Sequence, residues 1–504
     1  MVRLLPLFLL PLALSAQSPD SAAIARLTEA ALPAALAQLE EFVAIPNDGN
    51  YPEQVEANLA WCRQNFTEKG FAVTRLETPG QPLLFAELTV DTSLPTVLFY
   101  LQIDGQPVDT AAWDQPNPYR VVYRRPGTDG SFADVLLPAA PPYDDELRLY
   151  GRSVSDAKGP AIAFLTALDV LAAEGLQPAY NVKVLMDFQE ELGSDDLPGA
   201  VTANRELLAA DYLVIMDGTR HVSNLPTLTF GARGIATVTL EVFGPRYALH
   251  SGQYGNFAPN PVFAAARLLA AMKDEQGRVL IPGFYEGVAL SEADRRQLGQ
   301  VPETREEVRA MVGIAENEAM GESYQEALQY PSLNVRGLRA GWVGTEVRTL
   351  IPEKVTVELD LRLVPETPGE RQLALLRQFI VDQGFHLVDS LPTEEERLRY
   401  PKLISFTAQQ GSVPFRTDLD TPIDHWLSKA VRHALGQEPV RMRTTGGSQP
   451  LGPFVQQLGL PAVALRIPNP DNSIHAPNEN LRLGNFREGI RECLAVLTIA
   501  PPTP

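Results

Sequence analysis

The chain has 504 residues, more than one compact core usually holds, so at least two domains are expected. Its composition, 45% hydrophobic and 21% charged, is ordinary for a globular protein. With 42 basic against 62 acidic residues the net charge is −20, which argues against non-specific binding to nucleic acid, because such binding requires a basic surface.

The amino terminus has the pattern of an export signal. Arg3 precedes an apolar run from Leu4 to Leu14, and small residues follow before Gln17. This run is too short to cross a bilayer and no later stretch is long and apolar enough, so we expect no membrane partner. The pattern predicts a signal peptide over residues 1–17 and a secreted or periplasmic protein.

Two cysteines, Cys62 and Cys493, lie in segments with helical patterns. In an oxidising compartment they can pair, and two buried free thiols are an equal alternative. The sequence leaves both alternatives open.

Strands and helices alternate through the first half of the chain. Short apolar runs predict buried strands at 96–103, 182–188 and 212–216, and helical spacing predicts helices at 159–175 and near 200–208. This alternation implies an α/β fold, with a mostly parallel sheet and helices on both of its faces.

The pattern changes after residue 234. Residues 235–243 and 354–364 alternate between apolar and polar, as half-buried antiparallel strands do. Further segments have helical or strand patterns; they are amphipathic helices at 260–272 and 370–383, a polar helical excursion at 303–326, a helix at 424–435, a strand at 461–467 and a last helix at 485–499. We predict a catalytic domain in two parts, 18–234 and 416–504, with an inserted α+β domain at 235–415.

Glu190 and Glu191 are the most informative pair in the chain. They follow the predicted strand 182–188 and precede a glycine turn, and ligands collect at the carboxyl ends of strands in open α/β sheets. Neighbouring residues on an extended chain point in opposite directions, so one carboxylate can bind a metal while the other faces a substrate water. Two solvated glutamates would be the simpler interpretation of this pair alone.

Other segments add polar groups of the same kind. Asp104, Asp156 and Asp217 lie after predicted strands or before a helix, and His250 and His475 lie in polar loops bounded by prolines. Each has a simpler role by itself, such as a helix cap, a turn or a surface histidine. Together they form a set of oxygen ligands and imidazole that suits zinc or a similar divalent ion.

Several short motifs occur in a fixed order along the chain. They are DGQPVD at 104–109, GRSVSDAKGP at 151–160, HSG at 250–252, RLVP at 362–365, GGS at 446–448 and HAPNE at 475–479. On these motifs, from about residue 38 to residue 494, the chain resembles the dinuclear-metal aminoacylase/dipeptidase family, the clan MH peptidases. It is most similar to the long, carnosinase-like dipeptidase branch.

The resemblance implies two divalent metal ions, with zinc as the first choice and manganese or cobalt as alternatives. By the same resemblance Asp156 would bridge the two ions. Glu191 and His475 would complete one site, and Asp217 and Gln102 the other. The family has histidine where this chain has Gln102, and a neutral amide oxygen is a poorer ligand for zinc than imidazole. The site of Gln102 is therefore expected to be weak or empty.

The resemblance also implies catalytic and substrate-binding roles. Glu190 would be the general base, Asp104 would orient Gln102, and His250 would stabilise the oxyanion, in its own or in the partner subunit's site. The remaining residues would bind substrate; they are Arg362, Gly447, Ser448 and Asn334. The inserted domain would serve as a lid and as the platform of a homodimer.

These roles describe a secreted metallopeptidase that cleaves dipeptides or short peptides, with a small peptide as its partner. Two alternatives remain open. One is an amidohydrolase of the same fold that removes an acyl group from an amino acid. The other is a metal- or peptide-binding protein that has lost turnover, because Gln102 replaces the family histidine.

Overall fold

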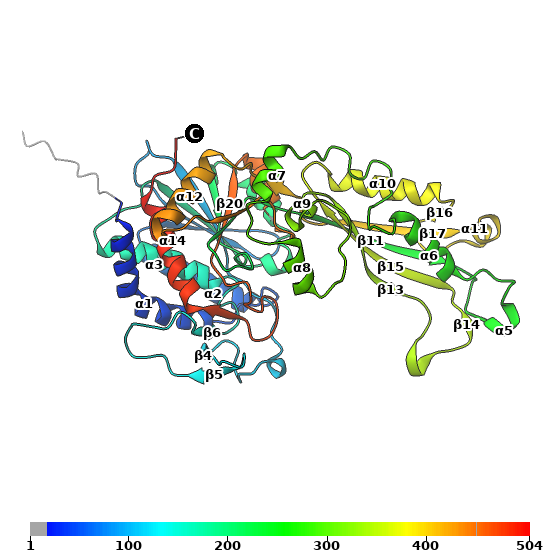
Figure 1. Ribbon diagram of the computed structural model, residues 1–504, viewed down its shortest axis with the longest axis horizontal. Coiled ribbons are helices and arrows are strands. Elements are labelled where there is room, and N and C mark those ends of the chain that lie inside the picture. The colour runs from blue at the N-terminus through cyan, green and yellow to red at the C-terminus, as the bar shows by residue number, and fades with distance from the viewer. Residues whose placement is uncertain (1–17, 450, 504) are drawn as a thin grey trace, which may run out of the picture.

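The computed structural model describes residues 18–449 and 451–503. The signal peptide predicted for residues 1–17 lies outside the described residues. Within the described ranges, no helix combines the length and the apolar character needed to cross a membrane. Figure 1 shows a broad main domain from which a narrower lid domain extends like an arm.

An eight-stranded sheet forms the centre of the main domain. Its order is β1-β2-β7-β3-β8-β20-β9-β19, and the strands are β1 (Ala72–Leu76), β2 (Leu83–Leu88), β7 (Asn181–Asp187), β3 (Thr96–Gln102), β8 (Tyr212–Ile215), β20 (Ala462–Arg466), β9 (Thr227–Thr229) and β19 (Val440–Met442). The central strands β7, β3, β8 and β20 are mutually parallel. Every residue of β7 is buried, because helices cover both faces of the sheet.

The helices of the main domain divide between the two faces of this sheet. One core contains residues of α1 (Ser21–Val43), α2 (Pro52–Glu68), α3 (Lys158–Ala173), α12 (Pro422–Leu435) and α14 (Leu483–Thr498). A second core, on the opposite face, contains residues of α4 (Leu197–Ala203) and α13 (Gly452–Leu458). The predicted α/β class with helices on both faces is therefore confirmed.

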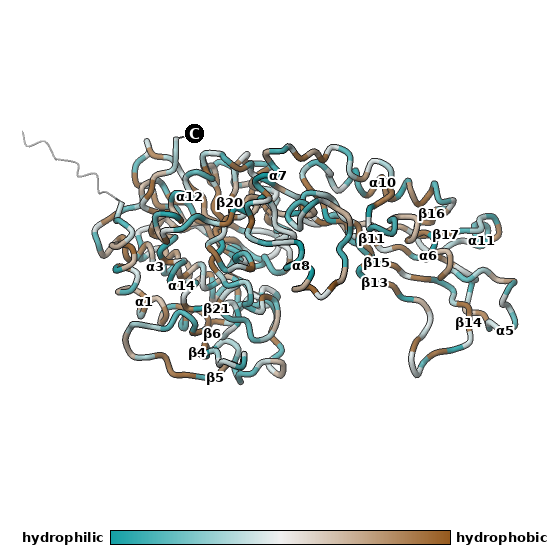
Figure 2. Tube along the Cα trace, in the orientation of Figure 1, coloured by the Kyte–Doolittle hydropathy of each residue, from teal (hydrophilic) through white to brown (hydrophobic). Residues whose placement is uncertain are grey.

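The lid domain has one five-stranded sheet with only one covered face. Its order is β13-β15-β11-β17-β16, with β13 (Ser332–Arg339), β15 (Lys354–Leu363), β11 (Gly234–Phe243), β17 (Leu403–Gln410) and β16 (His386–Val388). The helices α6 (Pro261–Met272) and α10 (Gly369–Asp382) pack on the buried face. Residues alternate between buried and half-buried along β11 and β15, which confirms the predicted antiparallel pair. Figure 2 shows that apolar residues recur along the elements of both domains rather than in one continuous segment.

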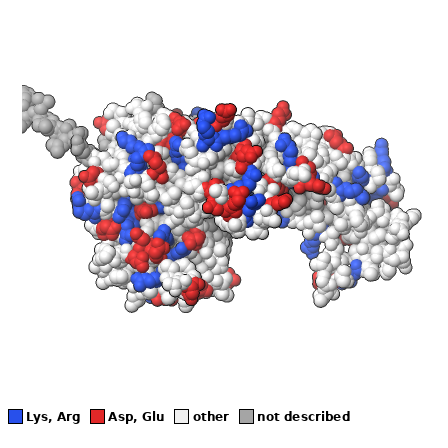
Figure 3. Space-filling model, in the orientation of Figure 1, with Lys and Arg blue, Asp and Glu red and all other residues white. Residues whose placement is uncertain are grey.

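Short elements fill the junction and the tip of the lid domain. At the junction lie α7 (Glu292–Leu298), α8 (Arg305–Val312), α9 (Tyr324–Ala327) and the pair β10 (Gly231–Ala232) and β18 (Phe415–Arg416). At the far tip lie α5 (Ser251–Tyr254) and the pair β12 (Leu249–His250) and β14 (Leu350–Ile351). Acidic and basic side chains are interspersed on the face seen in Figure 3, and the molecule is hollowed between the main domain and the lid tip.

Three sequence-based expectations need correction. The helix expected near 200–208 is α4, which begins earlier, with Pro198 favoured in its first turn, and ends at Ala203 with Asn204 as its C-cap. The polar excursion at 303–326 is two short helices, α8 and α9, since α8 ends at Gly313 in the left-handed region. A separate four-stranded sheet was not expected; it contains β21 (Asn480–Arg482), β6 (Arg148–Tyr150), β4 (Val122–Pro126) and β5 (Phe132–Val135).

Candidate metal centre

The loop that carries Asp156 is held by Glu479, a residue from near the end of the chain. The buried Glu479 carboxylate accepts hydrogen bonds from the backbone N–H groups of Ser153, Ser155 and Asp156 at 2.9 to 3.0 Å. It also pairs with Arg152 at 2.8 Å. Hydrogen bonds to an ionised acceptor are stronger than neutral ones, so this network fixes the position of the Asp156 backbone.

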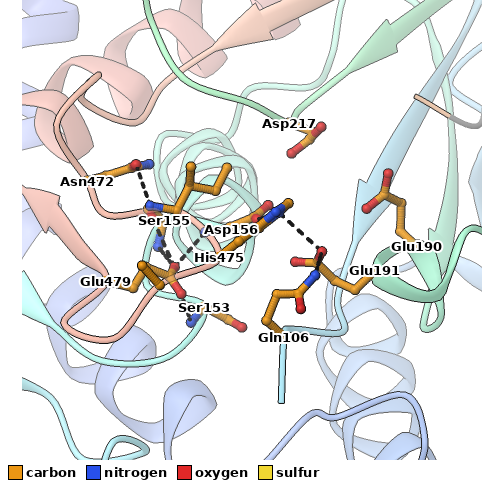
Figure 4. Close-up of polar contacts among 12 residues, drawn as sticks. Gln106, Ser153, Ser155, Asp156, Glu190, Glu191, Asp217, Asn472, His475 and Glu479 are labelled. Atoms are coloured by element: carbon orange, nitrogen blue, oxygen red, sulfur yellow. Dashed lines mark hydrogen bonds and ion pairs between the residues drawn. The ribbon is translucent and has the colours of Figure 1, made fainter. Parts of the chain in front are cut away.

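Asp156, Glu191 and His475 come together as a set of three ligands. His475 Nε2 lies 3.0 Å from Asp156 Oδ2 and 3.2 Å from Glu191 Oε2. One ligand atom from each residue lies within 4.8 Å of the others, and Figure 4 shows His475 between the two carboxylates. The His475 backbone has φ of 60°, a strained conformation for a residue with a side chain, and such strain is held where function requires it. Gln106 Nε2 donates to Glu191 at 2.8 Å and steadies that carboxylate.

Glu190 and Glu191 lie on a 3-10 turn, η2 (Glu190–Leu192), rather than on extended chain as predicted. Asp104 stabilises this turn, because its two carboxylate oxygens accept hydrogen bonds from the backbone N–H groups of Glu190 and Glu191, each at 3.0 Å. The prediction that Asp104 orients Gln102 stays a prediction; both Asp104 oxygens serve the turn, and among the described residues the Gln102 amide has no hydrogen-bond partner. Asp104 positions Glu190 and Glu191.

Asp217 follows the end of β8 and faces the same space. Its Oδ2 accepts a hydrogen bond from Gln449 Nε2 at 2.7 Å. Asp156, Glu190, Asp217 and His475 line a single cavity of about 320 Å³. Figure 4 shows the carboxylates of Glu190 and Asp217 turned toward the three-ligand set.

Burial and mutual repulsion disfavour the ionised forms of the carboxyl groups that crowd this cavity. Burial raises the pKa of Asp156 to about 7 and the pKa of Asp217 to about 6. Burial, followed by the charge of Asp217, raises the pKa of Glu190 well above its usual value. The hydrogen bond to Asp156 raises the pKa of His475 to about 9. Divalent cations would relieve this crowding of carboxylates, and the donor set of carboxylate oxygens and imidazole fits zinc or manganese.

Gln102 ends β3, the strand between β7 and β8, so it lies between the strands that lead to Glu190 and Asp217. Its amide nitrogen and amide oxygen are both buried, and neither has a hydrogen-bond partner within residues 18–449 and 451–503. Such an orphaned polar group costs about 1–3 kcal/mol. A metal ion on the amide oxygen would remove part of this cost, so the position fits a weak ligand.

The predicted substrate residues divide into two groups. Arg362 donates to Ser448 Oγ at 3.0 Å, and Gly447 and Ser448 line the cavity of the ligands. Asn334 is exposed on β13 and does not line that cavity. His250 is exposed on β12 at the lid tip, at the far end of the arm from the main domain (Figure 1). The described chain thus brings Arg362 close to the site but not Asn334 or His250.

Sequence reasoning missed part of the cavity wall. Further lining residues come from several segments, and they include His221, Glu303, Tyr324, Gln325 and Met442 as well as Arg220 and Arg466. His221 was one of only six histidines and lies four residues after Asp217, so its spacing was an available signal. Glu303 had no signal, because it lies in the lid insertion, far along the chain from any ligand.

Comparison with known proteins identifies the family. The model of "Peptidase family M20/M25/M40" matches residues 101–498. The chain is 27% identical to the Cys-Gly metallodipeptidase dug1 of Schizosaccharomyces pombe, over 85% of each chain. It is 27% identical to the Beta-Ala-His dipeptidase of Homo sapiens, over 90% of this chain and 87% of the relative.

A solved structure agrees with this assignment. The M20 family metallo-carboxypeptidase Sso-CP2 from Sulfolobus solfataricus superposes with a TM-score of 0.75 at 26% identity, covering 92% of this chain and 98% of the other. The family match extends over most of the main domain and all of the lid domain, including the Asp156, Glu191 and His475 set. The chain therefore belongs to Peptidase family M20/M25/M40 and is a metallopeptidase.

Proposed function

We propose that this metallopeptidase cleaves dipeptides or short peptides. The observation that carries the proposal is the convergence of Asp156, Glu191 and His475 on one point, beside the free carboxylate of Glu190 in a shared cavity. The names of the two relatives supply the substrate class, since both are dipeptidases.

Two divalent ions fit the residues of the cavity. Asp156, Glu191 and His475 would hold one ion, and Asp156, Asp217 and Gln102 would hold the other. When bound, such ions supply positive charge that lowers the pKa of water and polarises a carbonyl group. Zinc suits the first set, and the amide oxygen of Gln102 favours a harder ion such as manganese in the second.

Glu190 is the proposed general base. Its carboxylate lies outside the three-ligand set, and its raised pKa favours the transfer of a proton from water and then to the leaving amine. Asp104 positions Glu190 through the backbone N–H of the turn.

Arg362 and Ser448 would bind the carboxylate of the substrate. The planar guanidinium suits a carboxylate, and its contact with Ser448 places it at the edge of the cavity. This end of the cavity would then hold the carboxyl-terminal residue, which leaves the opposite wall for the amino-terminal residue.

The lid tip supports a homodimer as part of this proposal. Large apolar side chains are exposed toward this tip; they are Tyr247, Phe257, Phe263, Trp342, Val343 and Val347. An apolar surface of this kind marks a binding site, and a second copy of the chain is the occupant that would bring His250 to a catalytic cavity. Light scattering in solution checks this; a monomer at all concentrations would reject it.

Export is retained as a proposal. The charged and apolar pattern of residues 1–17 supports cleavage near Gln17. Amino-terminal sequencing of the protein from a secreting host checks the cleavage point, and an intact first residue in the exported fraction would reject it.

The decisive experiment uses protein stripped by a chelator. A panel of dipeptides and acylated amino acids is offered while zinc, manganese or cobalt is titrated in. Metal-restored cleavage of dipeptides would support the proposal. Cleavage of acylated amino acids alone would favour the amidohydrolase, and tight metal binding without any turnover would favour the non-catalytic binder.

A further inference from the structure

The catalytic cavity has a second acidic wall that no metal ligand provides. Glu303 and Tyr324 from the lid insertion, together with His221 from the loop after β8, line this cavity. Glu303 shares this cavity with Asp156 and Asp217, and its side chain is only 8% exposed. A carboxylate with so little solvent contact needs hydrogen-bond donors or a cation to offset the cost of its burial.

Two side chains hold the Glu303 carboxylate. Gln325 Nε2 donates to Oε1 at 2.8 Å, and His221 Nε2 lies 3.1 Å from Oε2. On the other side of the ring, His221 Nδ1 lies 2.9 Å from Ser223 Oγ and 3.2 Å from the backbone nitrogen of Ser223. These contacts orient the imidazole and, through it, the Glu303 carboxylate.

Within the described residues, the Glu303 carboxylate is not paired with a lysine or an arginine. Among residues 18–449 and 451–503, His221 is the one titratable group in ion-pair distance of Glu303. The carboxylate has lone pairs left after two hydrogen bonds, so it can accept a further donor from the cavity.

We propose that Glu303 forms a subsite for a basic side chain on the amino-terminal residue of the substrate. This inference rests on the proposed dipeptidase function. Arg362 and Ser448 are proposed to hold the carboxyl-terminal carboxylate, and Glu303 lines the same cavity as Ser448, so the proposal assigns the amino-terminal residue to Glu303. Tyr324 and Met442 line the same cavity and offer apolar surface to the methylene stem of a lysine or arginine.

The first test uses the wild-type protein loaded with metal. It compares kcat/KM for lysyl-leucine with norleucyl-leucine, which lacks the ammonium group, and with Nε-acetyl-lysyl-leucine, which keeps the length and loses the charge. A hydrogen bond between charged groups predicts a preference of about 10- to 100-fold for lysyl-leucine. Equal values for the three substrates would overturn the subsite.

The second test changes Glu303, the residue proposed to bind the basic side chain. Glu303→Gln keeps the size of the side chain and removes its charge, so the ratio of lysyl-leucine to norleucyl-leucine is expected to fall close to one. Glu306→Gln, on the exposed surface of α8, is the matched control and is expected to keep the wild-type ratio. An unchanged ratio in Glu303→Gln would overturn the proposal and assign the carboxylate a structural role.

A neutral dipeptide separates this inference from the proposed function. Cleavage of alanyl-leucine without any preference for lysine would reject the subsite alone. If no dipeptide is cleaved with any metal, the dipeptidase function fails, and calorimetric binding decides the subsite. Tighter binding of lysyl-leucine than of norleucyl-leucine would then support the acidic wall, and equal binding would overturn it.

Discussion

The main domain and the lid domain present their predicted site residues in opposite ways. In the main domain, Asp156, Glu191 and His475 lie within 4.8 Å of one another and are fixed by neighbours such as Glu479. In the lid domain, His250 and Asn334 are exposed and make no contribution to the cavity of their own chain. The three candidate metal ligands therefore come together within one chain, and of the predicted lid residues only Arg362 reaches the neighbourhood of the cavity, through Ser448.

The largest expected effect tests the main domain as a self-contained catalytic unit. Glu190→Gln removes the proposed base, so we expect kcat to fall by about 10² to 10⁴ while bound metal stays at the wild-type level. Steady-state kinetics and elemental analysis of the same preparation measure both. Glu206→Gln, an exposed residue of the main domain, is the control. Turnover within tenfold of wild type would show that Glu190 is not the base.

The second effect tests the lid as a donor to another subunit. His250→Ala is expected to lower kcat/KM by about 10² to 10³, as the loss of one oxyanion donor does. If His250 acts in the partner subunit, mixing this variant with Glu190→Gln restores part of the activity, because one mixed site is intact. Full activity of His250→Ala alone would remove the lid tip from the mechanism.

A third prediction concerns Gln102, the proposed weak metal ligand of the main domain. Gln102→His supplies an imidazole at the end of β3, so we expect affinity for a second zinc ion to rise at least about tenfold while the first ion binds as before. Calorimetric titration of chelator-stripped protein resolves the two binding steps. Identical isotherms for wild type and variant would mean that position 102 does not bind metal.

The smallest expected effect tests whether solvent and reagents reach the core of the main domain. Cys62 and Cys493 are buried and free, and burial raises the pKa of Cys62 to about 12. The reactive thiolate is scarce at every pH below that value, so native protein is expected not to react with a thiol reagent at pH 8, whereas unfolded protein shows two thiols. Rapid labelling of the native protein would indicate an open core, and no thiols after unfolding would indicate a disulfide.

Much of the main domain could be predicted from the sequence, because a buried strand is marked locally by a short apolar run and its end by the polar residues that follow. The apolar runs that become β3, β7 and β8 are parallel neighbours, so Gln102, Glu190 and Asp217 meet at one edge of the sheet. The lid strands β11 and β15 alternate because one face of their sheet is covered and the other is open. Residue order and polarity alone carry both patterns.

The tertiary structure decided what lies between distant segments. It placed Glu479 on the Asp156 loop, turned Asp104 toward the Glu190 turn, and brought Glu303 into the cavity. These contacts join parts of the chain that are about 85 to 325 residues apart, and no local periodicity encodes such pairings. The sequence by itself determined the family and the layered fold, and it predicted the candidate metal ligands Asp156, Glu191 and His475 that the folded chain brings together. Which side chains orient those ligands, and which further acidic group lines the cavity, depended on long-range packing that only the folded chain defines.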